Sequence, residues 1–123
     1  MICDACYPTF LLGRWVRDKG AIPLETAVAM LSGDAARLFG LSDRGLLEPG
    51  RAADVLLFDP TTVDAGTPRL AFDLPGGAAR LVAKATGVEM LIVNGQVVRE
   101  HGSVPGEADA LPGRLLRHGS ATA

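Results

Sequence analysis

The sequence predicts an α+β fold, with helices in the first third of the chain and strands in most of the rest. Before residue 45, apolar residues recur at helical spacing in stretches separated by glycine and proline. After residue 45, apolar residues gather into short runs bounded by turn residues. We therefore expect a helical segment at residues 1–44, a strand-rich segment at residues 45–117 and a disordered tail at residues 118–123.

Three helices are expected in the helical segment. The first, of about three turns, lies between Pro8 and Gly20, since proline suits a helix start and glycine its end. Its buried face is expected to consist of Leu11, Leu12, Trp15 and Val16. The second helix runs from Pro23 to Ser32, with an apolar stripe at Leu24, Ala27, Val28 and Leu31. The third runs from Asp34 to Phe39, with Gly40 as its cap.

The strand-rich segment contains two clear turn signals. Residues 48–51, Glu-Pro-Gly-Arg, fit a type II turn, because glycine occupies the position that needs a positive φ. The apolar run Val55–Phe58 follows and reads as a strand covered on both faces. Asn94-Gly95, between the β-branched runs 89–93 and 96–100, predicts a hairpin.

The remaining connections are rich in glycine and proline. Residues 60–87 are expected to cross the surface, with one short element at residues 79–84. Residues 111–117 are expected to be able to fold back onto the domain. The connections therefore contribute little regular structure.

Composition excludes several classes of function. The 12 basic and 14 acidic residues form no block of one sign, which argues against nucleic acid or an anionic membrane surface as a partner. Aromatic residues make up 5% of the chain, too few for a base-stacking surface. No apolar run approaches the roughly 20 residues that span a bilayer, and Asp4 stands where a signal peptide needs positive charge. A cytoplasmic location is expected.

Two cysteines form the one motif with metal or redox potential. Cys3 and Cys6 are spaced as Cys-x-x-Cys, but a zinc site needs two more ligands, and His101 and His118 lie near the other end of the chain. No strand precedes the pair, as a thioredoxin-like motif would require. We favour two reduced cysteines beside a helix start and keep a zinc or redox protein as a minor alternative.

The polar residues within the recognisable motifs fit structural roles. Asp54 enters a strand beside a turn and is expected to accept backbone hydrogen bonds. Asp59 precedes a proline in a turn, and Asn94 serves the hairpin conformation. His101 and Ser103 are close in sequence, but that does not orient a nucleophile against a base. The sequence therefore predicts no catalytic, cofactor-binding or metal-ligating residue in this chain.

The order of these elements resembles the C-terminus of the amidohydrolase superfamily over residues 2–117. The central motif is Gly45-x4-Gly50-x-Ala52-Ala53-Asp54-Val55-x2-Phe58-Asp59. Three further stretches are most similar to the N-acyl-D-amino-acid deacylase, or D-aminoacylase, branch: residues 7–17, Asp73-Leu74-Pro75-Gly76-Gly77 and residues 111–116. The resemblance implies that the helical segment comprises the last helices of a TIM-type barrel and that the strand-rich segment is part of a small β-sandwich.

The resemblance also implies a chemistry. The family hydrolyses linear amide C–N bonds with a metal-activated hydroxide, and zinc is expected for the complete enzyme. The family's metal ligands lie on upstream barrel strands, and Asp4 lacks the Ser-Asp context of the family's proton-shuttling residue. We expect a fragment that lacks the metal site and is inactive alone, acting in the full protein on N-acyl-D-amino acids.

The expected partners are protein segments. The strands at residues 53–58 and 88–99 should present unpaired edges or apolar faces, which the missing N-terminal barrel portion or a second copy of the chain would cover. The alternative function is a free-standing, non-catalytic domain that docks on a partner or self-associates.

Overall fold

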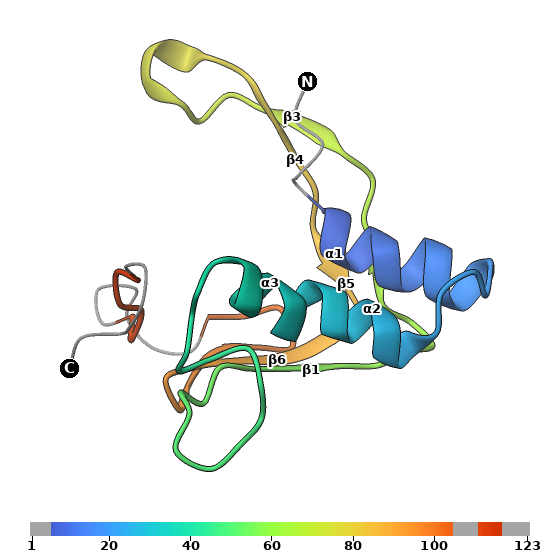
Figure 1. Ribbon diagram of the computed structural model, residues 1–123. Coiled ribbons are helices and arrows are strands. Elements are labelled where there is room, and N and C mark those ends of the chain that lie inside the picture. Colours follow the sequence, from blue (N-terminus) through green and yellow to red (C-terminus); the bar gives the residue numbers. More distant parts are fainter. Residues whose placement is uncertain (1–5, 105–110, 117–123) are drawn as a thin grey trace. The chain divides into compact units, whose positions relative to one another are not determined.

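The computed structural model describes residues 6–104 and 111–116 (Figure 1). Helices come first and small antiparallel sheets follow, which confirms the predicted α+β class. The helices are α1 (Tyr7–Phe10), η1 (Leu11–Asp18), α2 (Leu24–Leu31), α3 (Gly33–Leu38) and η2 (Pro75–Gly77). The strands are β1 (Val55–Phe58), β2 (Asp64–Ala65), β3 (Arg69–Ala71), β4 (Arg80–Val82), β5 (Ala85–Thr86), β6 (Val88–Val93) and β7 (Gln96–Glu100).

The contacts divide the chain into two units that interleave along the sequence. The first unit contains residues up to 23 together with 59–87, and the second contains residues 24–58 together with those from 88 onward. Each unit has its own helices and strands. The expected division at residue 45 into a barrel portion and a sandwich portion stays a prediction, and the tail at 118–123 lies outside the described residues.

In the first unit, α1 continues directly into η1, which is a π-helix. The backbone N–H of Lys19 bonds to the carbonyl of Arg14, five residues earlier. A π-turn holds more residues than an α-turn, so it rotates the following side chains away from the face that α-helical spacing predicts. Leu12 is accordingly buried, at 3% exposure, whereas Trp15 is 43% exposed. The prediction that Trp15 lies on the buried face of the helix is therefore wrong.

The strands of the first unit form two short antiparallel pairs. β2 pairs with β5, and β3 pairs with β4. The prediction of one short element at residues 79–84 corresponds to β4, while β2, β3 and β5 were missed. Two- and three-residue strands are too short to show a period of two, so their pairing comes from contacts distant in sequence. Val63, beside β2, is 1% exposed, the lowest value for a large side chain among the described residues of this unit.

In the second unit, α2 and α3 contact each other, and each buries a small side chain. Ala27 and Ala36 are buried at 0% and 7% exposure. Both helices lie within one or two residues of their predicted positions, and Gly40 has the positive φ of a C-terminal cap, 67°. The local helix signals were therefore sufficient here.

The second unit also contains a three-stranded antiparallel sheet in the order β1-β6-β7. Asn94 and Gly95 connect β6 to β7 with φ values of 48° and 79°. β1 lies at the edge of this sheet, and its Leu56 and Leu57 are 44% and 55% exposed. The expectation that β1 is covered on both faces is wrong for the described chain, because an apolar run does not say which segment covers it.

Within the described residues, none of the helices combines the length and the apolar character needed to cross a bilayer.

Candidate functional site

The candidate site of the second unit is the loop between α3 and β1, which carries the motif with the strongest sequence signal. Gly45 passes directly over α3 with a φ of 86°. A Cβ placed on Gly45 would lie 2.4 Å from the Cβ of Ala36, so only glycine fits at this crossing. The close approach holds the start of the loop against the helix.

Arg44 organises the charges of this loop. Its side chain is 11% exposed, and its guanidinium donates hydrogen bonds to Asp43, at 3.2 and 3.1 Å, and to Asp54. The hydrogen bonds to Asp43, followed by the charges of Asp54 and Asp43, outweigh burial and raise the pKa of Arg44. Arg44 therefore stays charged and joins the loop to the entry of β1.

Asp54 accepts a backbone hydrogen bond, as predicted. Its Oδ1 lies 2.8 Å from the backbone nitrogen of Asn94, and the N–H of Gly95 donates to the carbonyl of Ala53 at 2.9 Å. The side-chain amide of Asn94 donates to the carbonyl of Pro112 at 2.6 Å. This contact places Pro112, from the stretch expected to be able to fold back, against the β6–β7 turn. Asp54 therefore ties β1 to the β6–β7 turn.

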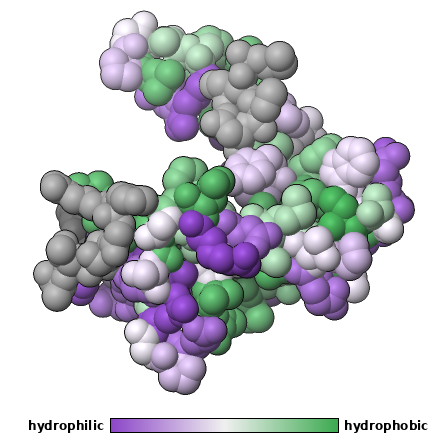
Figure 2. Space-filling view, in the orientation of Figure 1, coloured by the Kyte–Doolittle hydropathy of each residue, from purple (hydrophilic) through white to green (hydrophobic). Residues whose placement is uncertain are grey.

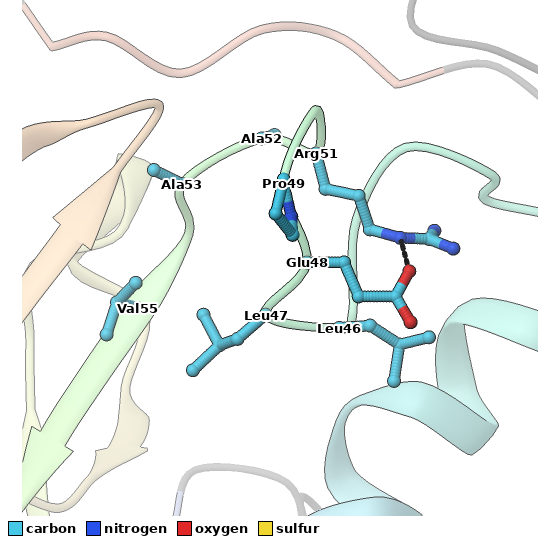
Figure 3. A pocket seen from close by; sticks show the side chains of 8 residues that line it. All are labelled: Leu46, Leu47, Glu48, Pro49, Arg51, Ala52, Ala53 and Val55. Atoms are coloured by element: carbon cyan, nitrogen blue, oxygen red, sulfur yellow. Dashed lines mark hydrogen bonds and ion pairs between the residues drawn. The ribbon is translucent and has the colours of Figure 1, made fainter.

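The predicted type II turn borders a shallow hollow of about 250 Å³ (Figure 3). The turn is closed by a hydrogen bond from the N–H of Arg51 to the carbonyl of Glu48, with Gly50 at a φ of 88°. The hollow is lined by Leu46, Leu47, Glu48, Pro49, Arg51, Ala52, Ala53 and Val55. The carboxylate in this lining is paired with the Arg51 guanidinium at 2.7 Å. The hollow therefore has a mostly apolar lining, with one ion pair, and its lining residues offer no nucleophile with a neighbouring base.

The first unit contains a second charged cluster, which the sequence analysis did not identify. Arg17 on η1 donates to the Asp64 carboxylate at 2.9 Å and to the carbonyl of Val63 at 2.5 Å, and it also pairs with Asp18 at 2.9 Å. The hydrogen bond from Arg17, followed by one from the N–H of Ala65, lowers the pKa of Asp64. The cluster fastens η1 to β2.

Gly13, inside the predicted first helix, is the residue from which the sequence could have indicated this contact. Gly13 is buried, and a Cβ built on it would lie 2.7 Å from the carbonyl oxygen of Val63. Glycine within a helix costs stability, so it often marks a close backbone approach. The sequence shows that such an approach exists but not which segment approaches.

Two of the remaining sequence candidates, Asp59 and His101, have side-chain partners. Asp59 accepts hydrogen bonds from the backbone and hydroxyl of Thr61 and from Thr62, which lower its pKa and confirm a turn role. His101 faces the carboxylate of Glu89 at 2.9 Å. Cys6 is a half-buried free thiol. The other candidates, Cys3, Asp4 and His118, lie outside the described residues.

A metal centre does not fit the side chains that the structure describes. Over residues 6–104 and 111–116, no three or more His, Cys, Asp or Glu side chains group so that they could hold an ion. The carboxylates of the two clusters are occupied instead by Arg17 and Arg44. Both clusters join segments that are separated in the sequence.

Comparison with known proteins assigns the class. Residues 7–99 match the family model described as "Amidohydrolase family", and this span includes η1, the α3–β1 loop and the β6–β7 turn. The chain belongs to the amidohydrolase family.

The relatives point to one branch of this family. The chain is 39% identical to N-acyl-D-glutamate deacylase of Alcaligenes xylosoxydans xylosoxydans over 94% of its own length and 21% of that protein. A structure of D-aminoacylase, studied for its binuclear metal centre, matches with 40% identity and a TM-score of 0.66, over 81% of this chain and 19% of that one.

A third relative has been solved with a metal. N-acyl-D-glutamate deacylase from Bordetella bronchiseptica, in complex with zinc and a phosphonate inhibitor, matches with 38% identity and a TM-score of 0.65. The match covers 89% of this chain and 20% of that one. The chain thus spans about a fifth of the length of the relatives it matches.

Proposed function

We propose that this chain is the C-terminal portion of a metal-dependent deacylase that hydrolyses the amide bond of N-acyl-D-amino acids. The observation that carries the proposal is the 39% identity to N-acyl-D-glutamate deacylase over 94% of the chain. Identity over nearly the whole chain, together with solved relatives at TM-scores of 0.65 and 0.66, supports the same place in a larger fold. In that fold the chain supplies the last barrel helices and part of the β-sandwich.

The role proposed for this portion is structural. Its arginine–carboxylate clusters hold segments together, and their charges are already paired. The relatives are between four and five times as long, which leaves most of their length for residues that hold the metal and the substrate. When bound there, zinc would supply an activated water for attack on the amide carbonyl. By itself, the chain is expected to be inactive.

A second candidate function is a free-standing, non-catalytic domain that associates with itself or with a partner. The exposed apolar side chains of the edge strand β1, Leu56 and Leu57, favour it. An uncharged edge strand is a ready template for pairing with another strand. For either candidate we propose a cytoplasmic location.

A chimera tests the first proposal. In the Alcaligenes N-acyl-D-glutamate deacylase, the segment that matches this chain is replaced by the complete chain, and hydrolysis of an N-acyl-D-glutamate is measured together with bound zinc. We expect activity within about tenfold of the host enzyme, which corresponds to about 1.4 kcal/mol in the barrier.

Two controls sharpen the result. The host enzyme with the segment deleted should lose hydrolysis, and the chain alone should show none. A chimera that folds and binds zinc but does not hydrolyse the substrate would contradict the proposal, because the chain would then be unable to take the place of the family's C-terminal portion.

A further inference from the structure

The hairpin formed by β3, η2 and β4 in the first unit has two faces of different chemistry. β3 and β4 pair antiparallel, with Leu70 opposite Leu81 and Ala71 opposite Arg80. Figure 1 shows this hairpin, in yellow-green and yellow, extending away from α1 and β5. In Figure 2 both hydrophobic and hydrophilic surface lies over it.

One face is charged and closed by an ion pair. Arg80 donates two hydrogen bonds to the two oxygens of Asp73, both at 2.7 Å. Since Arg80 lies opposite Ala71, Asp73 two residues later lies on the same face as Ala71. The Arg80–Asp73 ion pair thus extends the cross-strand contacts of the hairpin beyond the three residues of each strand.

The other face is apolar and exposed. Side chains alternate between the two faces along an extended chain, so Phe72 lies on the other face from Asp73. Phe72 therefore shares a face with Leu70 and with its cross-strand partner Leu81. These three side chains are 69%, 58% and 41% exposed, respectively. We call them the apolar face of the hairpin. A two-stranded hairpin is marginally stable in water by itself, so a face of this composition is expected to be covered.

The size of the apolar face limits what covers it. A buried aromatic side chain contributes about 150–250 Å². Even at that area for each, three side chains stay below the roughly 800 Å² per partner of a stable interface between separate molecules, and two of them are smaller leucines. A segment of the same polypeptide can pack stably on a smaller area, because covalent linkage removes most of the entropic cost of association.

We propose that the apolar face of the β3–β4 hairpin packs against the part of the deacylase that lies outside this chain, and so attaches the first unit to it. This inference rests on the proposed function, in which the remaining four-fifths of the relatives' length supplies the covering segment. The partner surface should be apolar and uncharged, matching Leu70, Phe72 and Leu81.

Thiol labelling of the chimera described above tests the proposal. Phe72→Cys is introduced on the apolar face, and Arg69→Cys, also at an exposed position, serves as the control on the charged face. Each variant is treated with iodoacetamide in the isolated chain and in the chimera, and peptide mass spectrometry separates the new thiol from Cys3 and Cys6.

We expect labelling at position 72 to be at least about tenfold slower in the chimera than in the isolated chain, because alkylation requires an accessible thiolate. The rate at position 69 should be nearly equal in both. If Phe72→Cys prevents folding of the chimera, Leu81→Cys reports on the same face.

Two results would overturn the inference. Equal rates at position 72 in the isolated chain and in a folded chimera would show that the face stays open. Protection that already appears in the isolated chain and grows with its concentration would assign the face to a second copy. Hydrolysis by the chimera is measured separately, so a failed docking face is distinguishable from a failed proposed function.

Discussion

Individual residues in this chain show how charge is used to connect segments rather than to perform chemistry. Asp54 follows a turn and leads into a strand, a position from which a catalytic role is tempting. It instead bonds Arg44 and the backbone of Asn94, 40 residues later in the sequence. An aspartate satisfied in this way has little capacity left for a substrate, which agrees with the structural role predicted for it.

Gly13 provides a test at the residue scale. Gly13→Ala should destabilise the chain by about 1–3 kcal/mol, because the new methyl group would lie 2.7 Å from the Val63 carbonyl oxygen and 2.9 Å from the Asp64 carboxylate. The measurement is the free energy of unfolding in urea. Gly113→Ala is the matched control, since a Cβ there meets nothing within 4 Å. Equal stabilities of the two variants would show that η1 and β2 do not approach closely.

At the scale of elements, the attachment of η1 to β2 depends on the charge of Asp64. Its pKa is lowered by the hydrogen bond from Arg17, so the folded state binds its proton less readily than the unfolded chain does. The contribution to stability is complete above the unfolded pKa of about 3.9 and is lost as the pH falls through the lower, folded pKa. Arg17 does not titrate in this range.

We therefore expect Asp64→Asn to reduce the loss of stability between pH 5 and acid pH. The measurement is thermal unfolding across that range for the native chain, Asp64→Asn, Arg17→Ala and the double variant. Arg17→Ala should reduce the pH dependence only in part, because the N–H of Ala65 still donates to Asp64. The effects of the two changes on the pH dependence should not add, because both remove the Arg17–Asp64 pair. An unchanged pH dependence in Asp64→Asn would mean that the ion pair does not contribute.

The elements also differ in how well the local sequence predicts them. The residues of α2, α3 and the Glu48–Arg51 turn carry strong local signals, and these predictions are confirmed. The π-helical character of η1 left no periodic signal, and its effect was to expose Trp15. β2 and β5 are two residues long, which is too short for any pattern to show.

At the scale of the molecule, the β1 edge of the β1-β6-β7 sheet has consequences for association, because no other strand of the described residues pairs with it. β1 consists of four apolar residues without a charge, whereas the opposite edge strand, β7, carries Arg99 and Glu100. Charged side chains on an edge strand oppose pairing with another chain. We therefore expect β1, and not β7, to be the edge through which isolated chains associate.

Sedimentation velocity on the isolated chain tests this expectation. A species of at least twice the chain mass should appear as concentration rises, and Leu57→Lys on β1 should weaken its formation by placing a charge at the edge. Leu38→Lys on α3, 80% exposed and outside the sheet, is the control. A monomer at all concentrations would contradict self-association through β1.

The sequence alone was sufficient to indicate the family and the structural role of Asp54, because both depend on short motifs. A turn residue, a helix cap or an Asn-Gly pair acts on its immediate neighbours, so its effect can be read from the local sequence. Without a metal-ligand pattern, the same motifs also led to the prediction of no site residues, which stays a prediction. The pairing of Arg17 with Asp64, the neighbours of Gly13 and the exposure of β1 required the folded chain. Arg17 and Asp64 are 47 residues apart, and periodicity describes one face of one element but not the segment that packs on it.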